Sequence, residues 1–399
     1  MLPAMVLWVS ALSILGLAAM ALPQLRKRGV DRWLVSYLGD CRKRRLPRPG
    51  EEVHLVLCIA DHYEPYHGGV ESERARARAR TWLAEYPRLF RGFHDSDGRP
   101  PQHTFFYALE QYDPEILDGL ASLGTQGFAE VEIHLHHDAD TAANLRKTLM
   151  EFRDILTQRH GLLARDRRSG ATAYGFIHGN WALDNSHPDG RFCGVDNELE
   201  ILSQTGCYAD FTLPSAPSPT QARKINSIYY ARGRPGCRKS HDHGVEVGTA
   251  SKDRPASDAL LLIQGPLLLD WGRRKWGLFP RLENGCLQAS QPPCIRRVAS
   301  WLKARVQVPL RPDWYFVKLH AHGAPEESHA TLLGEPMVRF HRALAEFARC
   351  HPEFHYHYVT AREMCNLVHA AEEGWKGNIA EARDYQLVPV RELAVSREW

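Results

Sequence analysis

Short apolar runs recur along the chain, and each one ends in polar or ionisable residues. Parallel strands that are buried on both faces have this continuous apolar character, whereas half-exposed strands alternate apolar and polar residues. The pattern therefore predicts a set of buried strands with polar carboxyl ends. The expected strands are 54–60, 104–107, 128–133, 174–178, 207–213, 315–319 and 354–359.

Stretches with helical periodicity separate these strands, at 72–90, 114–123, 141–159 and 197–205. Alternation of strand and helix is typical of a parallel sheet with crossover helices, so we expect an α/β fold. A chain of 399 residues with 44% hydrophobic content can bury a core of that size. Such a chain can fold as one barrel-sized domain or as two smaller ones, and we expect a (β/α) barrel of about seven parallel strands over residues 51–372. A long loop insertion is expected near 214–258, and a C-terminal tail at 373–399.

The first 24 residues contain no charged side chain, and Leu2 to Leu22 is apolar apart from two serines. This stretch is long enough to cross a bilayer as one helix, so we expect a transmembrane anchor over residues 1–24. A cleaved signal peptide is the alternative, but its positive charge normally precedes the apolar run. Here the positive charges follow it. The positive-inside tendency then predicts a single-pass membrane protein with its globular domain on the cytoplasmic side, with the periplasmic side as the alternative.

Basic residues concentrate in the segment 25–50, whereas the formal net charge of the whole chain is only +3. A charge this small does not indicate a nucleic-acid partner. The basic segment suits anionic lipid headgroups, so the membrane is the expected partner. The nine cysteines show no Cys-x-x-Cys pair and no regular spacing, and we interpret them as reduced thiols that mostly pack in the core.

The strand end around residue 134 carries the strongest candidate chemistry. Side chains alternate across a strand, so Glu132, His134 and His136 share one face and His137 faces away. Neutral imidazole and carboxylate are ordinary ligands of zinc and similar divalent ions. Because α/β folds place their sites at the carboxyl ends of strands, other polar strand ends are expected to join this one in a single ring. They are Asp61, His62, His178, Asn180, Trp181, Asp210, His320 and His322.

In this order, the motifs resemble those of the polysaccharide deacetylases, which are deacetylase-like (β/α) barrel hydrolases. Asp61-His62 resembles their first motif, in which a catalytic aspartate precedes a metal-binding aspartate; here histidine stands at the second position. Thr104-Phe105-Phe106 resembles the next strand. Glu132 to His136 resembles the second motif, with Asp140 where the family has another histidine. Leu319-His320 resembles the last motif, while the Arg-x-Pro-Tyr segment of the family is absent.

The resemblance implies a division of roles among these residues. Asp61 would be the catalytic base and His320 the general acid. His62 and His136 would hold a divalent metal, with Asp140 or His134 as the third ligand. The resemblance implies zinc first, with cobalt, nickel or manganese as alternatives. Groups expected around substrate or behind the ligands are Glu132, His178, Asn180, Trp181, Asp210 and His322.

The function expected from the residues and the resemblance is a membrane-anchored, metal-dependent hydrolase that removes N-acetyl groups from a polysaccharide or a lipid-linked saccharide. Two alternatives remain open. The first is another amide or glycoside hydrolase on the same barrel, because a fold does not fix a reaction. The second is a non-catalytic binding or scaffold component that works with polysaccharide biosynthesis proteins.

Overall fold

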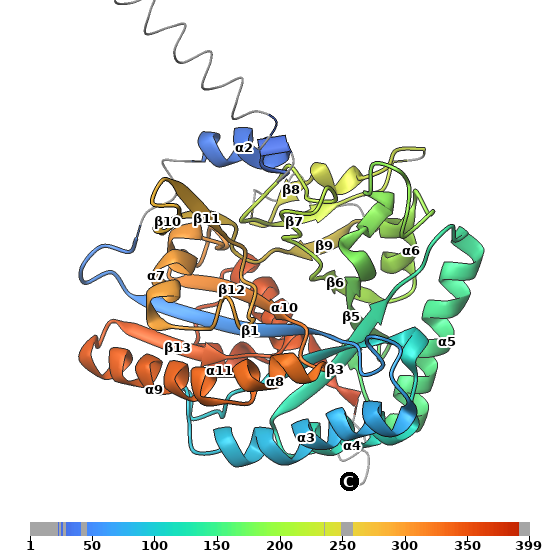
Figure 1. Cartoon of the computed structure of the whole chain (residues 1–399), viewed down its shortest axis with the longest axis horizontal. Coiled ribbons are helices and arrows are strands. Elements are labelled where there is room, and N and C mark those ends of the chain that lie inside the picture. Colours follow the sequence, from blue (N-terminus) through green and yellow to red (C-terminus); the bar gives the residue numbers. More distant parts are fainter. Residues whose placement is uncertain are drawn as a thin grey trace, which may run out of the picture.

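The computed structural model describes residues 23, 25–26, 29–40, 46–234, 236–248 and 258–390. In this part of the chain, strands and helices alternate and build one large, mostly parallel sheet with helices packed around it (Figure 1). The fold is therefore mixed α/β, as the alternating pattern predicts.

The main sheet contains twelve strands. They are β1 (Val53–Tyr63), β2 (His103–Ala108), β3 (Ala129–Leu135), β4 (Ala164–Asp166), β5 (Thr172–His178), β6 (Cys207–Asp210), β7 (Ile228–Ala231), β8 (Val245–Glu246), β9 (Leu260–Ile263), β12 (Trp314–Ala321), β13 (Phe354–Tyr358) and β14 (Leu387–Pro389). The order β12-β1-β2-β3-β5-β6-β9 is parallel throughout. Two further strands, β10 (Leu268–Lys275) and β11 (Phe279–Glu283), form a separate antiparallel hairpin.

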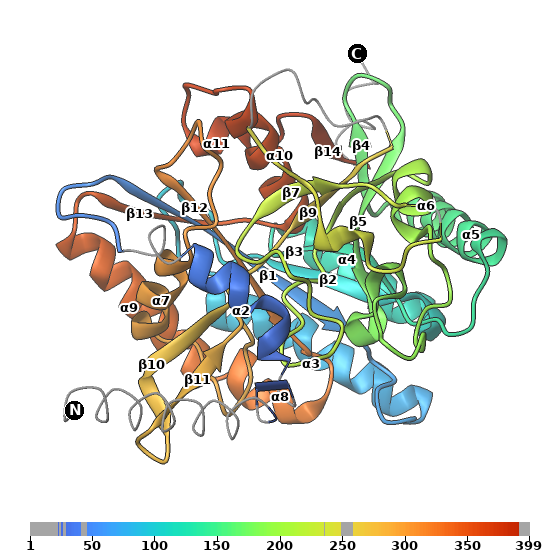
Figure 2. The same cartoon turned by 90° about the horizontal axis from the view of Figure 1, so that it is seen from above.

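Crossover helices connect the parallel strands and cover the sheet from outside (Figures 1 and 2). Each of β1, β2 and β3 is followed by a helix before the next strand of the parallel run. The helices are α2 (Val30–Gly39), α3 (Ser72–Phe90), α4 (Pro114–Thr125), α5 (Ala142–His160), α6 (Glu198–Gln204), α7 (Ile295–Ala304), α8 (Glu326–Leu332), α9 (Glu335–Cys350), α10 (Ala361–Glu372) and α11 (Ile379–Ala382).

The two faces of the sheet bury different side chains. Leu57 and Ile59 of β1 pack with residues of α3, α4 and α5, and we call this side the helix face. Cys58 and Ala60 point the other way, into a cluster that includes inward residues of β2, β5, β6, β9 and β12. We call this side the inner face. Because side chains alternate along a strand, residues at every second position share one face of the sheet. We call the face that this alternation gives a residue its parity.

The sheet curls around its inner face. The strands β9 and β12 end the parallel run, and among the described residues they share no backbone ladder. Their inward side chains nevertheless meet in one cluster, and Lys318 Nζ of β12 donates to the carbonyl of Phe211, just after β6, at 2.7 Å. The parallel strands therefore form a barrel-like arrangement whose carboxyl ends gather at one mouth.

Helix α10 fills the opposite half of the inner face. Strand β13 pairs with the first half of β1, and β2 pairs with its last residues. A gap lies between β13 and β2 along this edge of β1. In the gap Thr360 caps α10, and the amide of Ala361 donates to Thr104 Oγ1 at 3.0 Å. One side of α10 packs in the inner cluster. Helix α10 thus covers the inner face away from the carboxyl ends of the strands.

Every strand expected from the apolar runs forms, as do the four expected helices. The boundaries differ by one or two residues in most elements. The largest differences lie at the ends of β1 and β6. Strand β1 continues to Tyr63 rather than ending at residue 60. Strand β6 ends at Asp210 rather than at residue 213, because Thr212 turns back and donates its amide and hydroxyl to the Asp210 carboxylate.

Three segments hold more structure than the sequence pattern indicates. The expected loop insertion at 214–258 contains β7 and β8, and β7 pairs antiparallel with β9. The expected tail contains α11 and β14, which pairs with β4. The basic segment contains α2, whose Trp33 is fully buried against Ala216, Ile225 and Leu267. These corrections share one cause, because short elements that depend on partners distant in sequence leave little local periodicity.

The predicted transmembrane anchor, residues 1–24, lies outside the described residues except for Pro23. Within the described ranges, no helix combines the length and the apolar character that crossing a bilayer requires.

Candidate metal centre

Three strand ends place imidazoles and one carboxylate at the mouth of the curled sheet. β1 supplies His62 and, just beyond its end, Glu64. β3 supplies His134 and, one residue past its end, His136. His322 follows β12 directly. All five have the parity of the inner face, so the strand geometry directs them to one space.

Glu64 Oε1 is the common point of this group. It lies 3.4 Å from His134 Nε2, 3.7 Å from His136 Nε2 and 3.8 Å from His322 Nδ1. His62 completes a second triad with Glu64 and His322, and within each triad the candidate ligand atoms lie within 4.8 Å of one another. We call these five residues the inner centre.

Hydrogen bonds on the far side of two rings orient them toward Glu64. His134 Nδ1 donates to the carbonyl of Ile177 at 2.8 Å, which leaves its Nε2 as a lone pair. His136 Nδ1 contacts Glu110 Oε1 at 2.6 Å, which does the same for the second ring. A carbonyl or carboxylate behind an imidazole is the usual support of a metal-binding histidine. The Nε2 lone pairs of His134 and His136 then face Glu64 Oε1. A cation bound between these atoms removes the repulsion among them.

The pKa shifts follow from this geometry. Burial, with a smaller effect of neighbouring imidazoles, lowers the pKa of His62 well below its usual value, so this ring is neutral near pH 7. Its Nε2 has no hydrogen-bond partner although it is buried. Burial would raise the pKa of Glu64, but the imidazoles of His134 and His322 outweigh burial and hold it well below the usual range. An ionised carboxylate beside imidazole nitrogens is a donor set that suits a divalent ion.

A cleft of about 340 Å³ opens over this group. Its lining includes His322, whose side chain is 44% exposed, and Trp181, whose ring lies 4.4 Å from the ring of His62 between centroids. Asn180 also lines the cleft. The predicted residues His62, His134, His136, His322 and Trp181 are therefore brought together, and the first four can act as ligands.

Asp61, predicted as the catalytic base, lies on the other side of the sheet. Its carboxylate is fully buried on the helix face, where Oδ1 accepts from the amide of Gly323 at 2.6 Å and Oδ2 contacts His103 Nε2 at 2.9 Å. A Cβ at Gly323 would lie 2.1 Å from Oδ2, so only glycine permits this approach. Asp61 thus fixes the turn that carries His322 and does not reach the cleft.

His320, predicted as the general acid, is buried beneath Trp181. Burial, together with the charge of Lys318, lowers its pKa well below the usual value, and its Nδ1 has no partner. A ring that is neutral near pH 7 holds no imidazolium proton to donate, which disfavours the predicted role. Asp210, expected around substrate or behind the ligands, accepts from the hydroxyl of Thr212.

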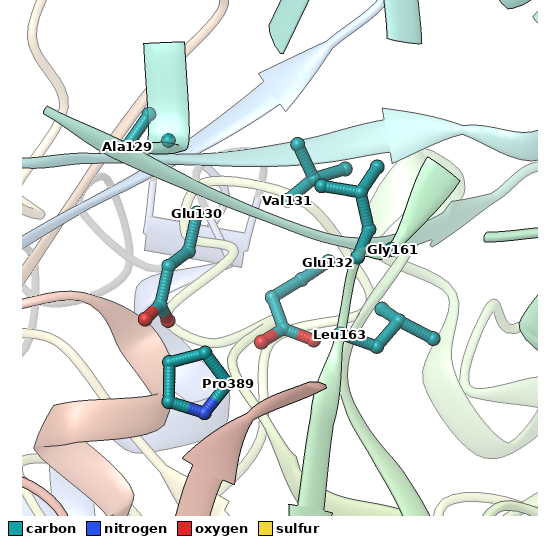
Figure 3. Close-up of a pocket in the computed structure, with 9 residues that line it drawn as sticks. Ala129, Glu130, Val131, Glu132, Gly161, Leu163 and Pro389 are labelled. Atoms are coloured by element: carbon teal, nitrogen blue, oxygen red, sulfur yellow. The ribbon is translucent and has the colours of Figure 1, made fainter. Parts of the chain in front are cut away.

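Glu132 shares the parity of the inner centre but lies deeper in the sheet. Its carboxylate accepts from the amide of Gly175 at 2.5 Å and from the hydroxyl of Tyr208 at 2.6 Å, and burial raises its pKa to about 8. Glu130 and Glu132 both project toward Pro389 in a pocket at the amino end of β3 (Figure 3). This pocket is at the opposite end of the strand from the histidines, so Glu132 is not a group of the cleft.

His178 and Asp140 belong to a different group. His178 ends β5 and has the parity of the helix face. Asp140 lies in the loop before α5 and contacts His137 Nδ1 at 3.0 Å. Asp140 also accepts from the side chain of Asn144 at the start of α5. The structure therefore does not bring Asp140 to His62 and His136, where the resemblance had implied it as a third ligand.

Two residues of the centre were not predicted, Glu64 and Glu110. Glu64 follows the Asp61-His62 pair by two positions, and alternation from His62 places it on the inner face. That signal was available in the sequence. Glu110 is different, because it sits in a 3-10 turn after β2 and reaches His136 only through the packing of two strands.

Comparisons with known proteins identify no relative. No family model matches the sequence, and no curated protein matches it. Among solved structures the chain is similar to a 4-alpha-glucanotransferase from Thermococcus litoralis, with a TM-score of 0.38 and 10% sequence identity. The similarity covers 79% of this chain and 40% of that enzyme, so the chain spans less than half of its length. A similarity at this level does not carry an activity over.

The position of Asp61 gives a prediction about stability. Asp61→Ala leaves the amide of Gly323 and the ring of His103 without their buried partner, so we expect the free energy of unfolding to fall by roughly 2–4 kcal/mol, measured by urea denaturation. Asp118→Ala is the matched control, because Asp118 also accepts from a histidine but is 64% exposed; its cost should stay below about 1 kcal/mol. Equal stability of Asp61→Ala and the wild type would contradict the structural role.

Proposed function

We propose that the protein is a metal-dependent hydrolase whose inner centre binds a divalent cation, zinc first, through Glu64, His134 and His136. The observation that carries the proposal is the convergence of imidazole lone pairs on one carboxylate oxygen at the floor of a cleft. Three protein ligands with space beside them suit a catalytic rather than a structural ion. When bound, such an ion activates water and polarises a carbonyl group.

The side chains around the ligands supply the remaining roles. His322 is half-exposed, lines the cleft and lies 3.8 Å from Glu64, so we assign it the proton transfer that the resemblance had given to Asp61 and His320. His62, neutral and next to both Glu64 and His322, either adds a ligand or holds His322 in place. Trp181 forms an apolar wall over the centre, which suits the face of a sugar ring.

We propose N-acetylated saccharides as the substrate class, with the acetyl amide as the bond that is cleaved. The support is the resemblance of the strand-end motifs and the presence of an aromatic wall beside the ligands. The position of Asp61 outside the cleft specifically favours a second candidate function. This candidate is another amide hydrolase with the same metal ligands and a different proton-transfer group. The membrane anchor and the cytoplasmic orientation remain proposals that rest on the sequence of residues 1–50.

The metal content of the purified protein tests whether the inner centre binds a cation. We expect His136→Ala and Glu64→Gln each to lose one equivalent of bound metal relative to the wild type, because each removes a ligand atom from the shared group, as measured by elemental analysis of the purified full-length protein. His351→Ala is the control, since the His351 ring bonds to the carbonyl of Phe347 and stacks on the ring of the same residue, far in sequence from the inner centre. Unchanged metal content in both ligand variants would refute the inner centre as a metal site.

Acetate release tests the reaction. The metal-loaded protein should release acetate from chitooligosaccharides, and Glu64→Gln should reduce the rate by roughly a hundredfold or more, because the activated water is lost. Metal binding without acetate release, combined with hydrolysis of another amide, would select the second candidate. Metal binding without any hydrolysis would overturn the proposal in favour of a binding role.

The pH dependence of metal binding gives a further prediction. Burial alone would lower the pKa of His136, but Glu110 outweighs burial and raises it. Protons compete with the metal for Nε2, so affinity should fall as the pH drops through this raised pKa. Glu110→Gln should shift the midpoint to lower pH and, by removing support from the ring, weaken binding roughly 10–100-fold at high pH.

Isothermal titration with zinc over a pH series measures both effects. Glu115→Gln, an exposed carboxylate on α4, is the control and should leave the curve unchanged. A midpoint that stays in place or moves to higher pH in Glu110→Gln would contradict the assignment.

A further inference from the structure

A second convergence of donor atoms lies on the helix face, behind the inner centre. It combines His137, two residues beyond β3, with His178 at the end of β5, Cys193 in the loop before α6, and Glu198 in the first turn of α6. One ligand atom from each lies within 4.8 Å of the others. We call these four residues the outer cluster. His178, Cys193 and Glu198 are completely buried.

Hydrogen bonds fix both imidazoles of the outer cluster. His178 Nδ1 contacts the carbonyl of Gly179 at 2.5 Å, and a carbonyl can only accept, so this nitrogen carries the proton. His137 Nδ1 contacts Asp140 Oδ2 at 3.0 Å, which favours the same state. The two Nε2 atoms are then lone pairs that face each other at only 2.9 Å.

The carboxylate of Glu198 adds a third lone pair at the same point. Its Oε1 lies 3.1 Å from His137 Nε2 and 3.4 Å from His178 Nε2. Its Oε2 accepts from the amide of Asp184 at 2.6 Å and lies 3.5 Å from Cys193 Sγ. Several acceptors that converge in a dry interior are unfavourable unless a cation lies among them. A proton on His137 Nε2 would lie between His178 Nε2 and Glu198 Oε1, at the place that a bound cation would otherwise occupy.

Another group in the fold shows how such a cluster is neutralised by the protein itself. Asp95, Asp97 and His357 also converge, but Arg383 donates to both carboxylates, at 2.9 and 2.8 Å. In the described part of the chain, no arginine or lysine forms an ion pair with Glu198. Unlike the group around Arg383, the outer cluster therefore depends on a protonated imidazole or on a bound ion for its positive charge.

The donor set indicates which cation fits. Two imidazole nitrogens, one thiol sulfur and one carboxylate oxygen make a four-donor set that suits zinc or a similar transition metal and does not suit magnesium or calcium. Burial of the donors leaves no open position for a substrate. Four protein ligands without an open position are typical of a structural ion.

We propose that the outer cluster is a second, structural transition-metal site, distinct from the inner centre and independent of the proposed hydrolase activity. The ion joins the ends of β3 and β5 to α6 and to the loop that carries Cys193. Upon binding, the Cys193 thiol would release its proton to solvent and coordinate as thiolate.

The ion would also hold two walls of the cleft. The amide of Asp140 donates to the carbonyl of Cys193 at 3.0 Å, and the amide of Phe192 donates to Asp138 at 2.7 Å, so the ligand loop is tied to the loop after β3. Phe192 lines the cleft. Trp181 follows His178 in a 3-10 turn and lines it as well. The outer site thus supports the cleft from behind.

Cobalt substitution tests the site through its thiolate. Full-length protein loaded with Co²⁺ should show a thiolate-to-cobalt charge-transfer band in the near ultraviolet, and the band should persist in His136→Ala, which disables only the inner centre. Cys193→Ser should lose the band and one equivalent of metal. Cys207→Ser is the matched control, because both thiols are buried and each contacts the carbonyl two residues ahead; it should retain both.

A second measurement does not require the cysteine variant to fold. In the His136→Ala protein, chelation should remove the one remaining equivalent and lower the melting temperature by several degrees, and zinc should restore it. Absence of the charge-transfer band in the wild-type protein, its loss in Cys207→Ser, or a metal-free His136→Ala protein of unchanged melting temperature would each overturn the proposal. In those cases the cluster would be a buried hydrogen-bond network closed by a proton.

Discussion

The alternation of side chains at the carboxyl end of β3 is the constraint on which the rest of the arrangement depends. His134 and His136 project to the inner face, whereas His137 projects to the helix face, where it meets His178 and Glu198. One short run of sequence therefore serves two groups of donors on opposite sides of one sheet. A register shift of a single residue would exchange the faces and dismantle both groups, because each needs partners on its own side.

The two groups differ in their access to solvent, and this difference separates their chemistry. The inner centre lies beneath a cleft with a half-exposed imidazole, His322, and an aromatic wall, Trp181. The outer cluster is enclosed between the sheet and α6. In both, an acceptor behind an imidazole, such as Glu110 behind His136 or Gly179 behind His178, directs the free nitrogen toward the shared carboxylate. The groups that orient the imidazoles therefore define the geometry of each cluster as much as the ligands do.

Asp61 shows how a motif can mislead when the geometry of its strand is left out. The dipeptide Asp61-His62 resembles a base followed by a ligand, yet adjacent residues of a strand face opposite sides. Once His62 points inward, Asp61 points to the helices, where it holds the turn that carries His322 through the amide of Gly323. The same alternation places Glu64 on the inner face with His62. Strand alternation alone was therefore enough to identify Glu64 as a candidate ligand.

The sequence by itself determined the α/β fold, nearly all of the parallel strands and the location of polar groups at their carboxyl ends, because these follow from local periodicity and strand alternation. It also determined which face His134, His136 and His137 occupy. Only the tertiary structure decided which strand ends meet, that Glu64 is the common point, and that Cys193 and Glu198 join His137 and His178. Those contacts depend on strand order, on the curl of the sheet and on the path of irregular loops, none of which leaves a periodic signal in the chain.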